Sequence, residues 1–242
     1  MWFKEGKYTP HGEVFDVGNA TRKALKRFLS GSTPLECGGL SDHDNGNGSL
    51  MRILPIVYYI LANYGTEITE NEEAMKIIHN VSALTHAHIR SLIACGIYCS
   101  IAAMLIGSLE LSTAVSLGIS KAVEFYRRHE EYSDELSHYE RLNNKSFASV
   151  PAEEIKSSGY VVDTLEAAVW CLLNSYNYKE CVLTAVNLGE DTDTVAAIAG
   201  GLAGLYYGYG SIPQEWLSVI VRLDYVEGIC SKLYEALSQR NF

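Results

Sequence analysis

The chain has 242 residues, 48% of them hydrophobic, with a formal net charge of −10 and a pI near 5.2. This length and composition allow a substantial core, and one domain over residues 1–242 is the simplest organisation. The acidic balance argues against a protein that grips nucleic acid through nonspecific phosphate contacts. No signal segment begins the chain, and its longest apolar run, from Ser91 to Ile106, is shorter than the ~20 residues of a membrane span. We therefore expect a cytoplasmic protein that binds neither nucleic acid nor membrane.

Apolar residues recur with helical spacing along most of the chain, whereas alternating runs of β-branched residues are nearly absent. We expect an all-α fold, an orthogonal multi-helix bundle. The expected helices, in chain order, are 19–29, 49–63, 71–78, 85–108, 111–126, 164–174, 179–187, 194–207 and 218–237. The six cysteines are scattered without a CxxC pair, which predicts reduced thiols.

Two segments between these helices have distinctive patterns. Asp163 and Glu166 have the spacing of an N-cap box, which predicts that Asp163 caps the helix 164–174 and that residues 159–162 form an extended lead-in. The charged stretch 127–145 breaks the helical periodicity. We expect it to be a solvated excursion without a catalytic role.

The densest group of polar side chains comes just before a run of small apolar residues. Glu190, Asp191 and Asp193 place three carboxylates within four residues, and the hydroxyls of Thr192 and Thr194 alternate with them. One interpretation is that Asp193 or Thr194 caps the following helix, because Asp and Thr are favoured at helix N-termini. The other is a site for a hard divalent cation, which takes oxygen ligands from such side chains. The residues alone leave the two interpretations evenly balanced.

A glycine-rich turn, Gly46-Asn47-Gly48-Ser49, precedes another apolar helix. Glycines allow a ligand to approach the backbone closely, and a helix N-terminus presents N–H groups to an anion. The turn lacks the Gly-Lys-Ser/Thr of a P-loop and the third glycine of a dinucleotide fingerprint, so it predicts neither of those sites. By itself the pattern more often marks an ordinary turn. For Arg52, just beyond the turn, three roles stay open: it orients the turn, it pairs with phosphate, or it forms a salt bridge.

Two more polar residues stand near expected helix starts. His86 follows Thr85, and His88 falls on another face of the chain. A lone His in such a setting is more often a hydrogen-bonded core residue than a ligand. Asp16 precedes the first long helix, where a cap or turn and a functional role are about equally common interpretations.

Together these segments resemble the ADP-ribosylglycohydrolase family. The similar segments are residues 190–194 with 199–204, the phosphate-loop segment 44–52, the Thr-His segment 84–86, and the stretches 15–21 and 159–167. The resemblance extends from Trp2 to about Ser231. It implies a hydrolase that removes ADP-ribose from a modified protein or small-molecule acceptor with two Mg²⁺ or Mn²⁺ ions.

The resemblance also implies a role for each motif. Pyrophosphate and ribose would be bound by the turn and the histidine, namely Gly46, Asn47, Gly48, Ser49 and His86. Asp191, Asp193 and Thr194 would bind the metal ions. Asp16 would face the ribose as a catalytic carboxylate. Glu190 would serve in catalysis or support the metal ligands.

In one respect the chain departs from the family pattern. Members share an N-terminal segment with Gly-Asp and then Thr-Asp-Asp-Thr, which supplies the other half of the metal site, and this sequence has no Asp-Asp pair. We therefore expect a chain shortened at its N-terminus that binds Mg²⁺ or Mn²⁺ weakly, because three ligands leave most of the water shell in place. ADP-ribose binding should persist while hydrolysis is slow or absent.

The alternative is a noncatalytic ADP-ribose-binding or structural protein of the same fold, since a fold does not establish an activity. The sequence leaves open whether the acceptor is an arginine, a serine, a dinitrogenase-type protein or a small molecule. Absent N-terminal helices would expose an apolar groove, which a homodimer contact could cover.

Overall fold

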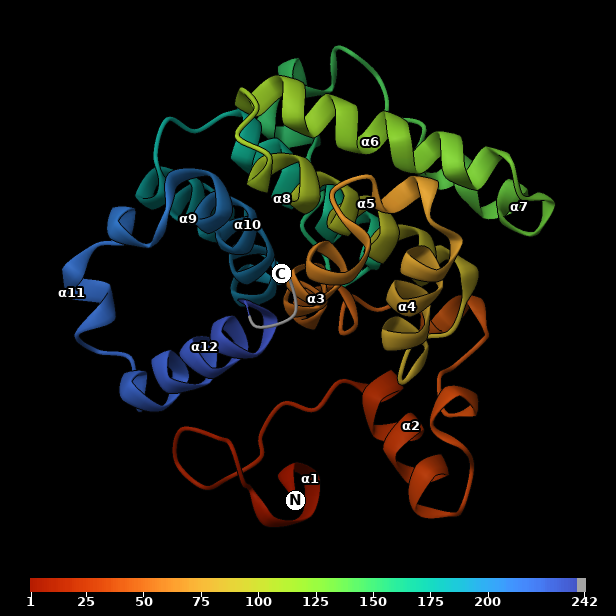
Figure 1. The fold of residues 1–242 in the computed structure, drawn as a ribbon, viewed down its shortest axis with the longest axis vertical. Coiled ribbons are helices and arrows are strands. Elements are labelled where there is room, and N and C mark those ends of the chain that lie inside the picture. Colours follow the sequence, from red (N-terminus) through yellow and green to blue (C-terminus); the bar gives the residue numbers. More distant parts are fainter. Residues whose placement is uncertain (239–242) are drawn as a thin grey trace.

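A computed structural model describes residues 1–238 of the chain. Within that range the protein is helical and contains no strand, which confirms the all-α prediction (Figure 1). Short 3₁₀ turns connect many of the helices. The α-helices are α1 (Trp2–Glu5), α2 (Asn19–Leu29), α3 (Pro55–Tyr64), α4 (Glu72–Ala83), α5 (Ile89–Ile106), α6 (Leu111–Arg127), α7 (Ser133–Leu136), α8 (Val161–Leu173), α9 (Tyr178–Asn187), α10 (Thr192–Tyr207), α11 (Gln214–Leu217) and α12 (Leu223–Ser238).

Helix α5 forms the centre of the fold, and α4, α6, α8 and α10 pack around it (Figure 1). It is long and apolar enough to cross a membrane, but 78% of it is buried inside the molecule. Its approach to α6 is especially close, because a Cβ atom on Gly118 would lie 2.6 Å from the Cα atom of Ile101. The hydroxyl of Ser100 also donates a hydrogen bond to the Gly118 carbonyl at 2.8 Å. Only glycine permits this crossing.

Local signals set several helix boundaries. Asn71 and Asn177 precede α4 and α9, and each side chain accepts a hydrogen bond from the backbone N–H three residues on. Pro55 begins α3, where its missing N–H costs nothing. The predicted helix 49–63 is therefore divided into a 3₁₀ turn and α3.

The predicted cap of α8 was wrong. The helix begins at Val161, so Asp163 lies inside its first turn. The N–H of Val161 donates to the carbonyl of Asn45 at 3.0 Å, and the carboxylate of Asp163 accepts from the Ser158 hydroxyl at 2.6 Å. The first N–H of α8 is thus satisfied by the carbonyl of Asn45, which is distant in the sequence, and not by the side chain of Asp163 that the sequence pattern suggested.

The prediction of a solvated excursion over residues 127–145 holds for most of the stretch, whose residues are mainly exposed, but two of its side chains belong to the core. The stretch contains α7, and the side chains of Tyr139 and Leu142 are 1% and 2% exposed. The Tyr139 hydroxyl donates to the carbonyl of Arg90 at 2.5 Å, which ties the stretch to the start of α5. Its few apolar residues are too widely spaced to show a helical period, yet they complete the core.

Helix α12 lies at the edge of the molecule and has no buried residue. A groove of about 520 Å³ separates it from α3, with an apolar lining that includes Tyr58, Leu61, Ile106, Leu233 and Leu237. Exposed apolar side chains continue onto the segment 219–221. That such a surface receives further helices or a second copy of the chain stays a prediction.

Candidate functional site

The segment that leads into the glycine-rich turn pairs with the Thr-His segment. Gly39 and His86 are matched as in parallel strands. The N–H of Gly39 donates to the carbonyl of Thr85 at 3.3 Å, and the N–H of Ala87 donates to the carbonyl of Gly39 at 3.0 Å. These bonds fix the position of His86 relative to the loop.

The turn itself, residues 46–49, is held on its other side by the start of α8. The N–H of Asn47 donates to the carbonyl of Gly159, and the N–H of Val161 donates to the carbonyl of Asn45, both at 3.0 Å. The predicted extended lead-in to α8 is therefore the partner of the turn. The segment before the turn is thus bonded to the Thr-His segment, and the turn itself to the start of α8.

The side chain of Asn47 connects the turn to α8 and α10. Its Nδ2 atom donates to Oδ2 of Asp191 at 2.6 Å and to the hydroxyl of Thr164 at 2.9 Å. Thr164 in turn donates to the carbonyl of Ser158 at 2.8 Å. The amide of Asn47 thus orients one carboxylate of the predicted metal set.

The imidazole of His86 lies against the two glycines of the turn. A Cβ atom on Gly48 would lie 2.9 Å from its Cε1 atom, and one on Gly46 would lie 3.7 Å from its Nε2 atom. The side chain is 2% exposed. Burial, together with the nearby charge of Arg52, lowers the pKa of His86 to about 4. The imidazole is therefore neutral at physiological pH.

Arg52 turns away from the glycine-rich turn. Its guanidinium donates to the carbonyl of Val81 at 3.2 and 3.3 Å and to the hydroxyl of Thr85 at 2.6 Å. Val81 lies in the last turn of α4, where a cation is favourable. Arg52 therefore forms no salt bridge within residues 1–238, and it contacts the end of α4 and the Thr-His segment instead of the turn.

The start of α10 carries the three predicted metal ligands. Asp191 occupies the N-cap position, but its side chain makes no capping hydrogen bond, and neither Asp193 nor Thr194 is the cap. The capping interpretation of those two residues is therefore wrong. Asp193 is exposed and Thr194 is buried. Within residues 1–238 no ion pair involves Asp191 or Asp193.

The two carboxylates predicted to be catalytic lie on exposed backbone with positive φ. Asp16 has a φ of 44° and Glu190 a φ of 52°, a conformation that non-glycine residues seldom adopt. Gly18, and not Asp16, is the N-cap of α2. No hydrogen bond in the described part of the chain joins either carboxylate to the turn or to His86.

The structure thus brings together part of the predicted set. Gly46, Asn47, Gly48, His86 and Asp191 meet in one place, from segments far apart in the sequence. Ser49 belongs to the turn, but its side chain is fully buried and accepts a hydrogen bond from the Cys95 thiol at 3.6 Å. Only its backbone could face a ligand.

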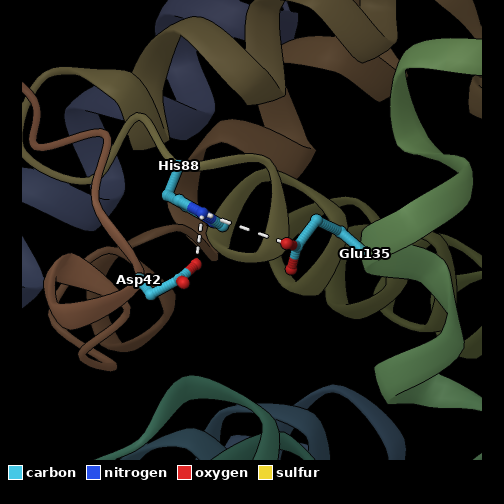
Figure 2. A group of neighbouring side chains, drawn as sticks. All are labelled: Asp42, His88 and Glu135. Carbon is cyan, nitrogen blue, oxygen red and sulfur yellow. Dashed lines mark ion pairs between the residues drawn. The ribbon is translucent and has the colours of Figure 1, made fainter.

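Sequence reasoning missed a second polar cluster beside this site. Figure 2 shows His88, at the N-cap of α5, between Asp42 of the preceding loop and Glu135 of α7. The Nε2 atom of His88 lies 3.1 Å from Asp42 Oδ1 and 4.0 Å from Glu135 Oε1. In the part of the chain that the structure describes, only this group places three ligand atoms of His, Cys, Asp or Glu within 4.8 Å of one another.

The charges around this cluster favour an ion-pair network over a metal centre. The guanidinium of Arg90 donates to Glu135 Oε2 at 2.5 Å and lies 3.7 Å from Asp42 Oδ1, so it forms ion pairs with both carboxylates. The network fastens the loop before the glycine-rich turn to α7. No local motif marks it, because Asp42 and Glu135 are separated by almost a hundred residues.

Comparisons with known proteins identify the family of the chain. A family model described as ADP-ribosylglycohydrolase matches residues 1–241. Proteins named ADP-ribosylarginine hydrolase Tri1 from Pseudomonas putida (strain GB-1) and Serratia proteamaculans (strain 568) are each 28% identical, over 98% and 100% of this chain. The ADP-ribosyl-(dinitrogen reductase) glycohydrolase of Rhodospirillum rubrum is 29% identical over 84% of it.

These relatives are longer than the chain. The matches span 58%, 60% and 59% of the Pseudomonas, Serratia and Rhodospirillum proteins. A solved structure titled ADP-ribosylglycohydrolase-related protein complex is 28% identical, with a TM-score of 0.68 over 93% of this chain and 70% of that one.

Proposed function

The chain belongs to the ADP-ribosylglycohydrolase family, and we propose that it binds ADP-ribosyl groups and hydrolyses the glycosidic bond that joins them to an acceptor. The observation that carries this proposal is the meeting of Gly46, Gly48, His86 and Asp191 through the side chain of Asn47. The backbone of the turn is suited to bind phosphate and the carboxylate of Asp191 is suited to bind a metal ion, and the side-chain amide of Asn47 connects them. The proposed hydrolysis uses both.

The binding part of the proposal assigns the pyrophosphate to the backbone of the turn, residues 46–49. Because two of its positions are glycines, the pyrophosphate can approach the backbone of the turn closely. The N–H of Asn47 is already bonded to Gly159, so the remaining N–H groups of the turn are the ones to contact phosphate. The neutral imidazole of His86 would contact the ribose or the adjoining phosphate.

The metal part assigns Mg²⁺ or Mn²⁺ to Asp191, Asp193 and Thr194. Their hard oxygen donors fit these ions. Asn47 restrains one oxygen of Asp191, and Asp193 pairs with no cation within residues 1–238, so neither carboxylate is compensated by the protein. Bound ions of this kind supply Lewis acidity toward ribose oxygens and toward a water molecule. Asn47, by restraining Asp191, would set the direction of that ligand.

The catalytic part assigns Asp16 and Glu190 to the ribose end of the site. Cleavage through an oxocarbenium-like transition state is helped by a carboxylate near the anomeric carbon. Both are exposed, and Glu190 directly precedes the metal ligand Asp191. These two roles are tested by Asp16→Asn and Glu190→Gln, each of which should lower the rate of release more than the affinity for ADP-ribose.

For the acceptor we propose an ADP-ribosylated protein, with arginine as the modified residue. The names of the Pseudomonas and Serratia relatives support this choice, since both specify ADP-ribosylarginine. A modified dinitrogen reductase, the substrate in the name of the Rhodospirillum relative, is the other protein to test.

The experiment incubates the chain with arginine-ADP-ribosylated protein and Mg²⁺ and measures free ADP-ribose by mass spectrometry. Asp191→Asn should abolish release, because it removes a charge while its amide oxygen can still accept from Asn47. Glu153→Gln also replaces a carboxylate by an amide, but at an exposed position outside the predicted site. It is the matched control and should leave release unchanged. Equal release by both variants would contradict the proposal.

One observation favours the noncatalytic alternative. Around Asp191 no third His, Cys or acidic ligand atom lies close enough, among residues 1–238, to complete a cluster. Calorimetric titration with ADP-ribose separates the two functions. Binding without release of ADP-ribose from any modified protein would identify an ADP-ribose-binding protein, whereas absence of binding would contradict both.

A further inference from the structure

Arg52 has an unusual environment for a charged side chain. It is half-buried, and no carboxylate within residues 1–238 pairs with it. Its acceptors are carbonyls at the end of α4 and the hydroxyl of Thr85, which at 2.6 Å is the shortest of these contacts. Because a guanidinium has only donors, Thr85 must be the acceptor in this pair.

That bond determines where the hydroxyl hydrogen of Thr85 points. Thr85 is buried, and the other polar atom within hydrogen-bond distance of its hydroxyl is Nδ1 of His86, at 2.7 Å. A buried hydroxyl that already accepts from Arg52 gains most by donating its own hydrogen. Nδ1 of His86 is therefore the acceptor and carries no hydrogen.

The hydrogen of the neutral ring must then be on Nε2, which lies against the turn. The Nε2 atom would be 3.4 Å from a Cβ on Gly48 and 3.7 Å from one on Gly46, so it faces the space that the missing side chains leave. It has no hydrogen-bond partner within the described residues. The donor of His86 is thus available to a ligand that enters over the two glycines.

We infer that Arg52 is a positioning residue, which acts through Thr85 to hold His86 as the Nε2–H tautomer and so presents a neutral hydrogen-bond donor to an oxygen of the ligand. Identification of that oxygen with a ribose hydroxyl or a phosphate oxygen of ADP-ribose rests on the proposed function. In this arrangement His86 donates a hydrogen bond and does not act as a general base. The low pKa of the imidazole is consistent with a neutral donor.

The test reads the tautomer directly. Long-range ¹H–¹⁵N spectra of the ¹⁵N-histidine-labelled full chain distinguish Nδ1–H from Nε2–H for each ring. We expect His86 as Nε2–H in the wild type and in Thr85→Ser, which keeps the hydroxyl, and a mixture of tautomers in Thr85→Val and Arg52→Met. His88 is the internal control, because its Nδ1 accepts from the N–H of Arg90 and should not respond.

Ligand binding gives the second measurement. ADP-ribose should shift the Nε2–H resonance of His86, and inorganic pyrophosphate and free ribose, added separately, show whether phosphate or ribose is the source of the shift. Arg52→Met should lower the affinity for ADP-ribose about fivefold, the usual effect of one hydrogen bond, with Thr85→Ser close to the wild type. Circular dichroism verifies that each variant is folded.

Two results would overturn the inference. One is a wild-type His86 protonated on Nδ1, and the other is binding of ADP-ribose that leaves the Nε2–H resonance unmoved. Failure of ADP-ribose to bind at all, with His86 still in the Nε2–H form, would instead contradict the proposed function and leave the role of Arg52 standing.

Discussion

Replacing Asn47 should show whether the turn and the metal ligands form one unit. Asn47→Ala removes one hydrogen bond to a carboxylate and one to a hydroxyl. Such bonds contribute about 1.5–3 and about 0.5–1.5 kcal/mol, so we expect a loss of about 2–4.5 kcal/mol in the free energy of unfolding. Asn47→Asp should cost more, although it keeps the shape, because it brings a second carboxylate to the 2.6 Å contact with Asp191.

The size of that extra cost follows from Coulomb's law. Two unit charges at the observed 2.6 Å separation repel by about 6 kcal/mol at an effective dielectric constant of about 20, which is an upper bound because the side chains can move apart. Urea unfolding of both variants measures the effect, and the difference between them should shrink in acid, where one carboxyl is protonated. Asn144→Asp, at an exposed position where the side chain only accepts hydrogen bonds, is the control and should change stability by less than about 0.5 kcal/mol. If Asn47→Asp were as mild as this control, the Asn47–Asp191 bond would not be the connection inferred here.

Three further changes test the packing, the turn and the metal site. Gly118→Ala should destabilise the fold by about 1–3 kcal/mol in urea unfolding, because its Cβ would meet backbone of α5; Gly228→Ala in α12, with open space around it, should be neutral or stabilising, and the reverse order would contradict the described crossing. Gly48→Ala should weaken ADP-ribose binding at least fivefold in calorimetry, because its Cβ would meet the imidazole, while Gly210→Ala, outside the turn and with open space around it, should bind like the wild type. Mn²⁺ binding, followed by electron paramagnetic resonance, should be weak and should disappear in Asp191→Ala; tight binding that survives would place the ion elsewhere.

Much of the fold could be predicted because helical periodicity is a local property. The expected helix 19–29 is α2 without change, and 111–126 and 194–207 differ from α6 and α10 by one or two residues. The larger differences have non-local causes. α8 begins early because a carbonyl of the glycine-rich loop accepts from its first N–H, and no pattern within α8 encodes that bond.

For the site, the sequence revealed residue types but not contacts. The high density of carboxylates identified Asp191 as a candidate, and the spacing of the glycines identified Gly46 and Gly48. Their connection through Asn47, however, depends on three segments that meet only in the folded chain. The network of Asp42, His88 and Glu135 shows the same limit. Each residue is unremarkable in its own segment, and only their juxtaposition creates a function, here the fastening of the loop.

Two separate sets of hydrogen bonds therefore hold the site, one at the imidazole of His86 and one at the glycine-rich turn. In the first, Arg52 and Thr85 determine which nitrogen of His86 carries the hydrogen. In the second, the side chain of Asn47 joins the turn to Asp191. The two supports should be separable by mutation, since no hydrogen bond in the described chain connects them directly. Loss of the first should weaken ligand binding with little change in metal affinity. Loss of the second should affect both, because the turn and the carboxylate would no longer share a donor.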